Sequence, residues 1–223
     1  SYIIADSYPD IIFTTSDKKE FVKTAVQNSS SSVNCEILTI EDIPLENDTN
    51  IVANDIFIDD SERTLFIIYT SGTTGSPKGV ELCYRNIMFN INAVSKEIPI
   101  FNKERNVMVL LPLHHIFPLL GSVVAPLSVG GTIYIADGLS AENILKTLNE
   151  GKINIIIGVP RLYDTLSKGV MSKINANFST RIIYKIVKLI GSDSLSKIVF
   201  KSVHQKFGNH IEYLVCGGAA LNI

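Results

Sequence analysis

The sequence predicts an α/β fold, with largely parallel sheet layers and flanking helices. Short apolar runs of strand length, rich in Ile and Val and bounded by turn residues, recur along the chain. Amphipathic helical patterns lie between several of these runs, and such alternation is typical of mainly parallel pairing. The 223 residues are 46% hydrophobic, so the chain can bury a sizeable core.

Each element is expected from its local pattern. The expected strands, most of which look buried on both faces, cover residues 11–14, 36–40, 65–70, 107–111, 132–136, 153–158 and 211–215. The helical patterns cover residues 17–27 behind a candidate cap at Ser16, residues 84–97, and residues 141–150 behind Ser140. Residues 165–211 also look helical, and residues 28–34 and 41–50 are expected to be surface loops.

Composition excludes several classes of protein. A charged fraction of 19% and a net charge of -2 exclude a disordered tail and a nucleic-acid binder that relies on bulk positive charge. Cys35, Cys83 and Cys216 lie far apart without a C-x-x-C pair, which favours a reduced, cytoplasmic setting over a disulfide framework. Residues 106–136 carry no Asp, Glu, Lys or Arg, but prolines and glycines interrupt them, so we expect core rather than a membrane span.

Charge is distributed unevenly along the chain. Residues 1–62 hold 13 acidic residues against three lysines, whereas residues 165–211 hold eight Lys or Arg against Asp193 alone. In the second segment aliphatic residues recur at helical spacing among Lys185, Lys188, Lys197 and Lys201; they are Ile182, Ile183, Ile186, Leu189, Ile190, Leu195, Ile198, Val199 and Val203. This pattern fits an ordinary solvated face over a core stripe, and it also fits a helix that contacts an anionic membrane surface.

The segment most informative about chemistry directly follows an expected strand. It reads Tyr69-Thr70-Ser71-Gly72-Thr73-Thr74-Gly75-Ser76-Pro77-Lys78-Gly79-Val80. Its hydroxyl residues and glycines make a flexible backbone whose N–H and O–H donors can converge on an anion, and Lys78 adds a mobile point charge. Converging donors and a mobile positive charge are what a polyphosphate-binding loop requires.

This loop is not a Walker A loop. In that pattern the lysine stands between Gly and Ser or Thr, whereas Pro77 and Gly79 flank Lys78. Residues 79–82 alternate like a strand, so we expect the phosphates to be held by a loop between strands rather than by a helix N-terminus. Composition alone leaves open a Ser/Thr/Gly turn without a ligand.

Three further segments occur downstream. They are Leu111-Pro112-Leu113-His114-His115-Ile116-Phe117, Gly158-Val159-Pro160-Arg161-Leu162-Tyr163 and Cys216-Gly217-Gly218-Ala219-Ala220-Leu221. With residues 69–80 they make the chain resemble the AMP-binding, adenylate-forming superfamily, which contains acyl-CoA synthetases, luciferases and adenylation domains of peptide synthetases. The V-P-R segment followed by basic helices most resembles the long-chain fatty acyl-CoA synthetases, also called long-chain fatty acid CoA ligases.

The resemblance implies a ligase that uses ATP, Mg²⁺ and coenzyme A. A fatty-acid carboxylate would attack the α-phosphate of ATP to give acyl-adenylate and pyrophosphate, and the thiol of coenzyme A would then displace AMP. The residues implied to hold the β and γ phosphates are Thr70, Ser71, Gly72, Thr73, Thr74, Gly75 and Lys78. Mg²⁺ would bridge the phosphate oxygens. Thr73, Lys78 and His115 are the residues expected to be catalytic.

By the same resemblance, His115 would lie near the acyl and adenylate pocket. Gly217, Gly218 and Ala219 would lie against the adenine ring, where small residues let a flat base approach the backbone. His114 and His115 are adjacent in a segment expected to be extended, so their side chains would point to opposite faces and would not share a metal ion. We expect no metal site made by protein ligands.

The resemblance implies that residues 1–223 are part of one AMP-binding domain, truncated at both ends and without the mobile C-terminal domain. We therefore expect this chain to be inactive alone. Its parent would act in fatty acid and lipid metabolism in the cytoplasm, or peripherally at the inner membrane surface. The expected partners are fatty acid, ATP and coenzyme A, with no nucleic acid and the oligomeric state left open. The alternatives are adenylation of an amino or aryl acid, and a non-enzymatic membrane-surface module.

Overall fold

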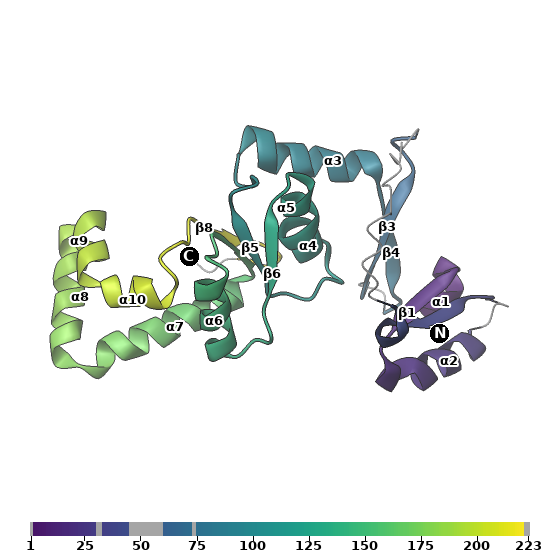
Figure 1. The fold of residues 1–223 in the computed structure, drawn as a ribbon, viewed down its shortest axis with the longest axis horizontal. Helices are drawn as coiled ribbons and strands as arrows, with labels where there is room; N and C mark the ends of the chain where they lie inside the picture. The colour runs from purple at the N-terminus through teal and green to yellow at the C-terminus, as the bar shows by residue number, and fades with distance from the viewer. Residues whose placement is uncertain (1, 30–32, 45–59, 73–74, 221–223) are drawn as a thin grey trace. The chain divides into compact units, whose positions relative to one another are not determined.

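The protein divides into two compact units in a computed structural model that describes residues 2–29, 33–44, 60–72 and 75–220 (Figure 1). The first unit is Ser1–Asn86 and the second is Ile87–Ile223. The boundary falls inside helix α3 (Tyr84–Asn92), which continues as a π-helical segment (Ala93–Glu97). Of the expected loops, residues 30–32 and 45–50 lie outside the described residues.

The first unit contains two small sheets. After helix α1 (Tyr2–Ser7), strand β1 (Ile11–Thr14) pairs in parallel with β2 (Glu36–Thr39), and helix α2 (Lys19–Gln27) connects them. A 3-10 turn (Ile40–Asp42) follows β2. Strands β3 (Thr64–Thr70) and β4 (Lys78–Cys83) form an antiparallel hairpin. This hairpin departs from the expected parallel pairing because a short loop joins its two strands.

Helix α2 begins later than predicted, and Ser16 is not its N-cap. Ser16–Lys18 form a 3-10 turn, and the helix begins at Lys19 without a side-chain cap. The backbone N–H of Ser16 instead donates to the carboxylate of Glu41, at 3.1 Å from Oε2. This partner lies 25 residues further along the chain, so no local pattern indicates it.

The second unit is built on a four-stranded parallel sheet in the order β6-β5-β7-β8. Its strands are β5 (Asn106–Val109), β6 (Thr132–Ile135), β7 (Ile155–Gly158) and β8 (Tyr213–Cys216). Three short helical segments connect β5 to β6, namely α4 (Ile116–Leu119), a π-helical segment (Leu120–Val124) and α5 (Ala125–Ser128). Within the described parts of the chain, no helix is long and apolar enough to cross a membrane.

Longer helices make the other two crossovers. Helix α6 (Ala141–Glu150) connects β6 to β7, and the predicted cap is confirmed, because Ser140 Oγ accepts from the backbone N–H of Asn143 at 3.1 Å. The helices between β7 and β8 are α7 (Pro160–Ala176), α8 (Phe178–Ile190), α9 (Asp193–Val199) and α10 (Lys201–Lys206).

The core of the second unit lies on β5 and β7. Met108 and Ile156, at most 1% exposed, pack with Leu148 of α6 in one cluster. Ile157 points to the opposite face, where its side chain meets the helical segment at Gly121. Burial on both faces is therefore confirmed for these two strands. It is wrong for most of the others, which keep exposed residues because they lie at sheet edges or in two-stranded sheets.

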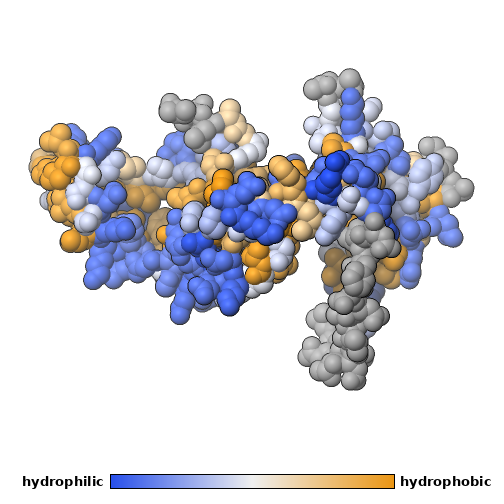
Figure 2. All heavy atoms as spheres, turned by 90° about the horizontal axis from the view of Figure 1, so that it is seen from above, coloured by the Kyte–Doolittle hydropathy of each residue, from blue (hydrophilic) through white to orange (hydrophobic). Residues whose placement is uncertain are grey.

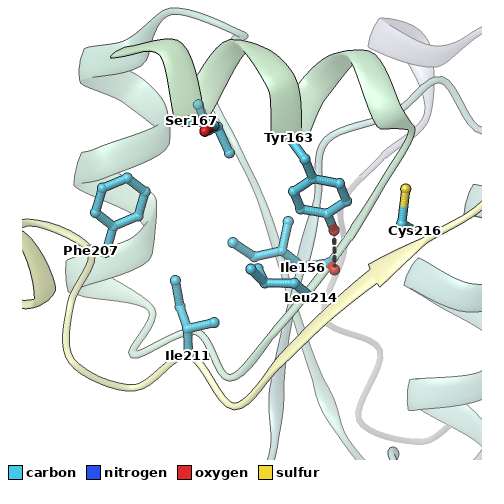
Figure 3. A pocket seen from close by; sticks show the side chains of 8 residues that line it. Ile156, Tyr163, Ser167, Phe207, Ile211, Leu214 and Cys216 are labelled. Atoms are coloured by element: carbon cyan, nitrogen blue, oxygen red, sulfur yellow. Dashed lines mark hydrogen bonds between the residues drawn. The ribbon is translucent and has the colours of Figure 1, made fainter. Parts of the chain in front are cut away.

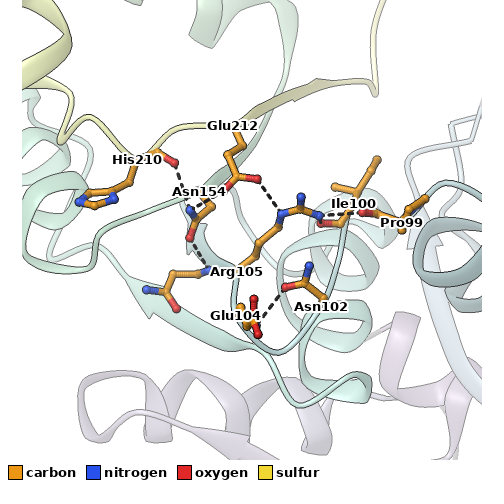
Figure 4. Close-up of polar contacts among 9 residues, drawn as sticks. Pro99, Ile100, Asn102, Glu104, Arg105, Asn154, His210 and Glu212 are labelled. Atoms are coloured by element: carbon orange, nitrogen blue, oxygen red, sulfur yellow. Dashed lines mark hydrogen bonds and ion pairs between the residues drawn. The ribbon is translucent and has the colours of Figure 1, made fainter.

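A polar network ties together the amino ends of β5, β7 and β8 (Figure 4). The Asn154 amide accepts from the backbone N–H of Asn106 at 2.9 Å and donates to Glu212 Oε1 at 3.0 Å and to the carbonyl of His210 at 3.1 Å. Arg105 Nε donates to Glu212 Oε2 at 2.8 Å. Since the strands are aligned at this end, the segments that leave their carboxyl ends emerge side by side.

Candidate functional site

The phosphate-loop residues singled out in the sequence lie in the connection between β3 and β4. Thr70 at the end of β3 pairs with Lys78 at the start of β4, so the chain turns back between these two residues. The prediction that a loop between strands carries this motif is confirmed. Thr73 and Thr74 lie outside the described residues.

The backbone of this loop closes on itself at Gly72. Gly72 has a φ of 57°, and a Cβ there would lie 2.4 Å from the carbonyl oxygen of Ser76. Gly75 also has a positive φ, of 88°, but its Cβ would point into open space. A Cβ on Gly72 would be 3.7 Å from Lys78 Cγ, so the lysine stem runs alongside the turn. Only glycine fits position 72 without moving the loop.

The polar side chains of the loop that the structure describes face solvent. Thr70, Ser71, Ser76 and Lys78 are exposed, and among the described residues Lys78 makes no ion pair. An ammonium group and hydroxyls that are exposed in one loop can attract an anion. The loop therefore presents donors and one positive charge to a ligand such as a polyphosphate.

Tyr69 anchors the strand that enters this loop. Its hydroxyl donates to Asp6 Oδ2 at 2.6 Å, which links β3 to α1. This hydrogen bond, assisted by partial burial, raises the pKa of Tyr69 to about 12. The ring lies against Gly79 on β4, where a Cβ would be 3.2 Å from Tyr69 Cζ. Sequence reasoning missed this anchor, because Asp6 is 63 residues away.

In the second unit, the three downstream motif segments follow the carboxyl ends of adjacent strands. Residues 111–117 follow β5, residues 159–163 follow β7, and residues 217–219 follow β8. Because β5, β7 and β8 are parallel neighbours, all three segments emerge at one edge of the sheet. The edge formed by the carboxyl ends of parallel strands is where open α/β sheets bind ligands.

These segments contact one another at Gly217. A Cβ on this residue would lie 2.8 Å from Phe117 Cζ, so the phenyl ring packs directly on the glycine backbone. The Gly217 N–H donates to the carbonyl of Gly158 at 3.2 Å, and Gly218 lies against the side chains of Val159 and Phe117. Residues 217–218 therefore contact both the segment after β5 and the segment after β7. Gly218 and Ala219 remain exposed.

His114 and His115 do not point to opposite faces, so that expectation is wrong. Their ring centroids lie 4.1 Å apart at an interplanar angle of 46°. Residues 113–115 form a turn rather than an extended strand, with the His115 N–H donating to the Pro112 carbonyl at 3.4 Å. Both histidines are exposed just before α4. Within the described ranges, no group of three or more His, Cys, Asp or Glu side chains could hold a metal ion.

Tyr163 of α7 joins two neighbouring strands, a contact that the sequence does not predict. Its hydroxyl donates to the carbonyl oxygen of Ile156 on β7 at 2.8 Å (Figure 3). The same hydroxyl lies 2.9 Å from the carbonyl oxygen of Val215 on β8, to which it also donates. Burial raises the pKa of this hydroxyl far above its ordinary value, and the neighbouring thiol of Cys216 adds to the shift. The hydroxyl therefore joins the two strands just before their motif segments begin.

An apolar pocket of about 470 Å³ lies beside Tyr163. Side chains of β7, β8, α7 and the segment after α10 line it, with Phe207 and Ile211 at one side and Cys216 at the carboxyl end of β8 (Figure 3). Its volume falls within the range of about 300–1,000 Å³ that is typical of small-molecule sites. The pocket therefore has the size and polarity to take a nonpolar group.

Comparison with known proteins identifies related sequences. The family model described as AMP-binding enzyme matches residues 1–222. The chain is 33% identical over 171 residues to long-chain-fatty-acid–CoA ligase 2 of Schizosaccharomyces pombe, covering 69% of this chain and 25% of that protein. It is 29% identical over 173 residues to long-chain-fatty-acid–CoA ligase 1 of Saccharomyces cerevisiae, covering 70% and 25%. The chain thus spans about a quarter of the length of these curated relatives.

Solved structures share the fold. The crystal structure of ATP-bound MatB from Rhodopseudomonas palustris matches with a TM-score of 0.64 at 20% identity, over 98% of this chain and 37% of that chain. This likeness confirms the α/β fold class with a parallel sheet. The phosphate loop lies in the first unit, whereas His115 and residues 217–219 lie in the second. The roles expected for these residues remain predictions.

Proposed function

Because the chain belongs to the AMP-binding enzyme family, we propose that it is part of an ATP-dependent acid–thiol ligase that joins a long-chain fatty acid to coenzyme A. Adenylate formation is the chemistry of this family. The long-chain acid, coenzyme A and Mg²⁺ are the finer parts of the proposal. The similarity to long-chain-fatty-acid–CoA ligases of two yeasts supports the acid and coenzyme A.

The observation that carries the proposal is the meeting of three motif segments at the carboxyl edge of the parallel sheet. Because Gly217 has no side chain, the Phe117 ring packs directly on one face of this backbone. The adenine ring would lie against the other face, at the exposed Gly218 and Ala219. The exposed imidazole of His115, on the same segment as Phe117, can donate to an oxygen of the bound adenylate.

The β3–β4 loop would hold the phosphates. Its exposed Lys78 ammonium and hydroxyls can stabilise the charge that collects on the leaving pyrophosphate. The donor set also suits Mg²⁺ that arrives with the nucleotide, because this ion is usually held by substrate phosphates with few protein ligands. When bound, Mg²⁺ would neutralise phosphate charge, with the hydroxyls of Thr70 and Ser71 as the available oxygen donors.

The proposed reaction has two displacements. A carboxylate oxygen of the acid forms a bond to the α-phosphorus of ATP, and the bond from that phosphorus to the bridging oxygen breaks, which releases pyrophosphate. The sulfur of coenzyme A then bonds to the acyl carbon, the acyl–oxygen bond to AMP breaks, and the thiol proton passes to solvent. The residues of this chain bind, orient and stabilise charge in the first step.

The apolar pocket beside Tyr163 supports an acid with a hydrocarbon tail. Cys216, directly before the proposed adenine segment, is one of its lining residues, and a nonpolar tail in the pocket would be removed from water. An amino or aryl acid is the second candidate substrate, because an apolar pocket can also take the side chain or ring of such an acid. Both candidates use the same phosphate loop.

Carboxylate-dependent exchange of pyrophosphate into ATP tests the proposal, in a protein of the relatives' full length. Fatty, aryl and amino acids are compared for wild type, for Lys78→Ala and for the control Lys23→Ala, which removes an exposed lysine on α2. We expect exchange with long-chain fatty acids, a loss of at least about tenfold in Lys78→Ala, since a charge-assisted contact is worth about 1.5–3 kcal/mol, and no loss in the control.

Two outcomes would overturn parts of the proposal. Exchange with only aryl or amino acids would replace the fatty-acid substrate but keep the adenylation chemistry. Exchange that is unchanged by Lys78→Ala would remove the phosphate-binding role of this loop. Folding of each variant is checked by its far-UV circular dichroism and its urea-unfolding midpoint, so that a loss of activity is not confused with a loss of structure.

A further inference from the structure

One face of helix α8 is apolar and exposed. The six residues on this face, named here the α8 face, are Phe178, Ile182, Ile183, Ile186, Leu189 and Ile190. Leu189 is 89% exposed and Phe178 is 69% exposed. Figure 2 shows hydrophobic residues gathered at the end of the second unit where α8 and α9 lie. Exposed clusters of this kind mark surfaces that meet a partner or a membrane.

The helix has a separate face for packing. At about 100° per residue, the α8 face covers an arc of roughly 140°, whereas Tyr184 and Val187 lie on the other side of the helix. Val187 is buried and Tyr184 packs edge-on against Phe200. Because the helix already packs through these residues, the stripe expected to cover a core is instead free among the described residues.

Positive charge borders the α8 face. Arg181, Lys185 and Lys188 fall on one flank of the apolar arc, and all three are exposed. Residues 178–206 carry six Lys or Arg against Asp193 alone. An apolar stripe with a basic border complements a surface that is nonpolar inside and negatively charged outside, which describes an anionic lipid bilayer.

We propose that the α8 face docks this protein on an anionic membrane surface. The helix would lie in the interface with its apolar side chains in the lipid and its basic border on the headgroups. Its 13 residues are too few to span a bilayer, which needs about 20. This contact is separate from the proposed ligase reaction and does not depend on it.

Vesicle co-flotation tests the proposal with the whole chain. Vesicles of phosphatidylcholine alone are compared with vesicles that also contain phosphatidylserine. We expect binding to the anionic vesicles to weaken roughly fivefold for each lysine replaced by alanine among Lys185 and Lys188, and to weaken with added salt. Leu189→Glu, alone or with Ile186→Glu, is expected to weaken binding at least about tenfold.

Phe89→Glu is the matched control, because Phe89 is also 74% exposed in the second unit but lies on α3, outside the α8 face. It is expected to bind vesicles like wild type. Equal binding to neutral and anionic vesicles, or Leu189→Glu binding as tightly as Phe89→Glu, would overturn the proposal. So would a lipid-free dimer that Leu189→Glu dissociates, because the face would then serve a second copy of the chain. Each variant is used only after its unfolding midpoint matches wild type.

Discussion

Replacing Gly72 with alanine should damage the phosphate loop far more than replacing Gly75. Both glycines lie in the same loop with positive φ, 57° and 88°. An L-residue in such a conformation costs about 1–2 kcal/mol, and both variants share this cost. Only at Gly72 would the new Cβ collide with the backbone, 2.4 Å from the Ser76 carbonyl oxygen, whereas at Gly75 there is open space.

The collision sets the difference between the two variants. An ordinary contact begins near 3.4 Å, so the Gly72→Ala loop must move by about 1 Å to relieve it. Forcing extra volume into a packed site costs about 1–3 kcal/mol. We therefore expect the stability of the chain to fall by about 2–5 kcal/mol in Gly72→Ala and by about 1–2 kcal/mol in Gly75→Ala. A displacement of about 1 Å is larger than the spread of hydrogen-bond distances, so the loop would lose donors that we propose bind phosphate.

Urea unfolding of this chain measures the stabilities, and isothermal titration calorimetry of the full-length protein with ATP measures the affinities. We expect Gly72→Ala to weaken ATP binding at least about tenfold, because each charge-assisted hydrogen bond contributes about 1.5–3 kcal/mol. Gly75→Ala is expected to weaken it less. Equal effects of the two substitutions on stability and affinity would refute the argument that backbone closure at Gly72 shapes the site.

Three further predictions concern the scaffold. Tyr163→Phe is expected to lower the free energy of urea unfolding by about 0.5–1.5 kcal/mol, since it removes the hydroxyl between β7 and β8. Asn154→Ala, which removes an acceptor and two donor contacts at the amino ends of the strands, is expected to cost about 1–3 kcal/mol in the same assay, and an unchanged midpoint would show that the network is dispensable. The raised pKa of Tyr69, about 12, predicts stability that is complete below pH 10 and falls as the pH rises toward 12, because only the unfolded phenol ionises readily there. This fall should be smaller in Tyr69→Phe, and equal slopes for the two proteins would contradict the linkage to Asp6.

Local patterns predicted the strands of the parallel sheet. The run at 153–158 is rich in Ile and contains β7, an inner strand of the sheet whose four residues are all buried. Ser140 was identifiable as a cap because the helix it begins follows it directly and the capping bond spans three residues. The loop between β3 and β4 was recognisable because its Ser, Thr, Gly and Pro residues lie between two strand-like runs. Signals of this kind are local, since neighbouring residues determine backbone conformation and capping.

Contacts between distant residues were decided only in the tertiary structure. Ser16 has the local pattern of a cap, but the carboxylate of Glu41, 25 residues away, accepts from its N–H.

The sequence alone determined the α/β class, the motifs and the order in which they occur. The tertiary structure decided that Phe117 packs on Gly217, that Tyr163 joins β7 to β8, and that the apolar stripe of α8 faces outward. The physical reason is that periodicity shows which side of a helix is apolar, whereas only the packing of residues far apart in the chain decides what covers it.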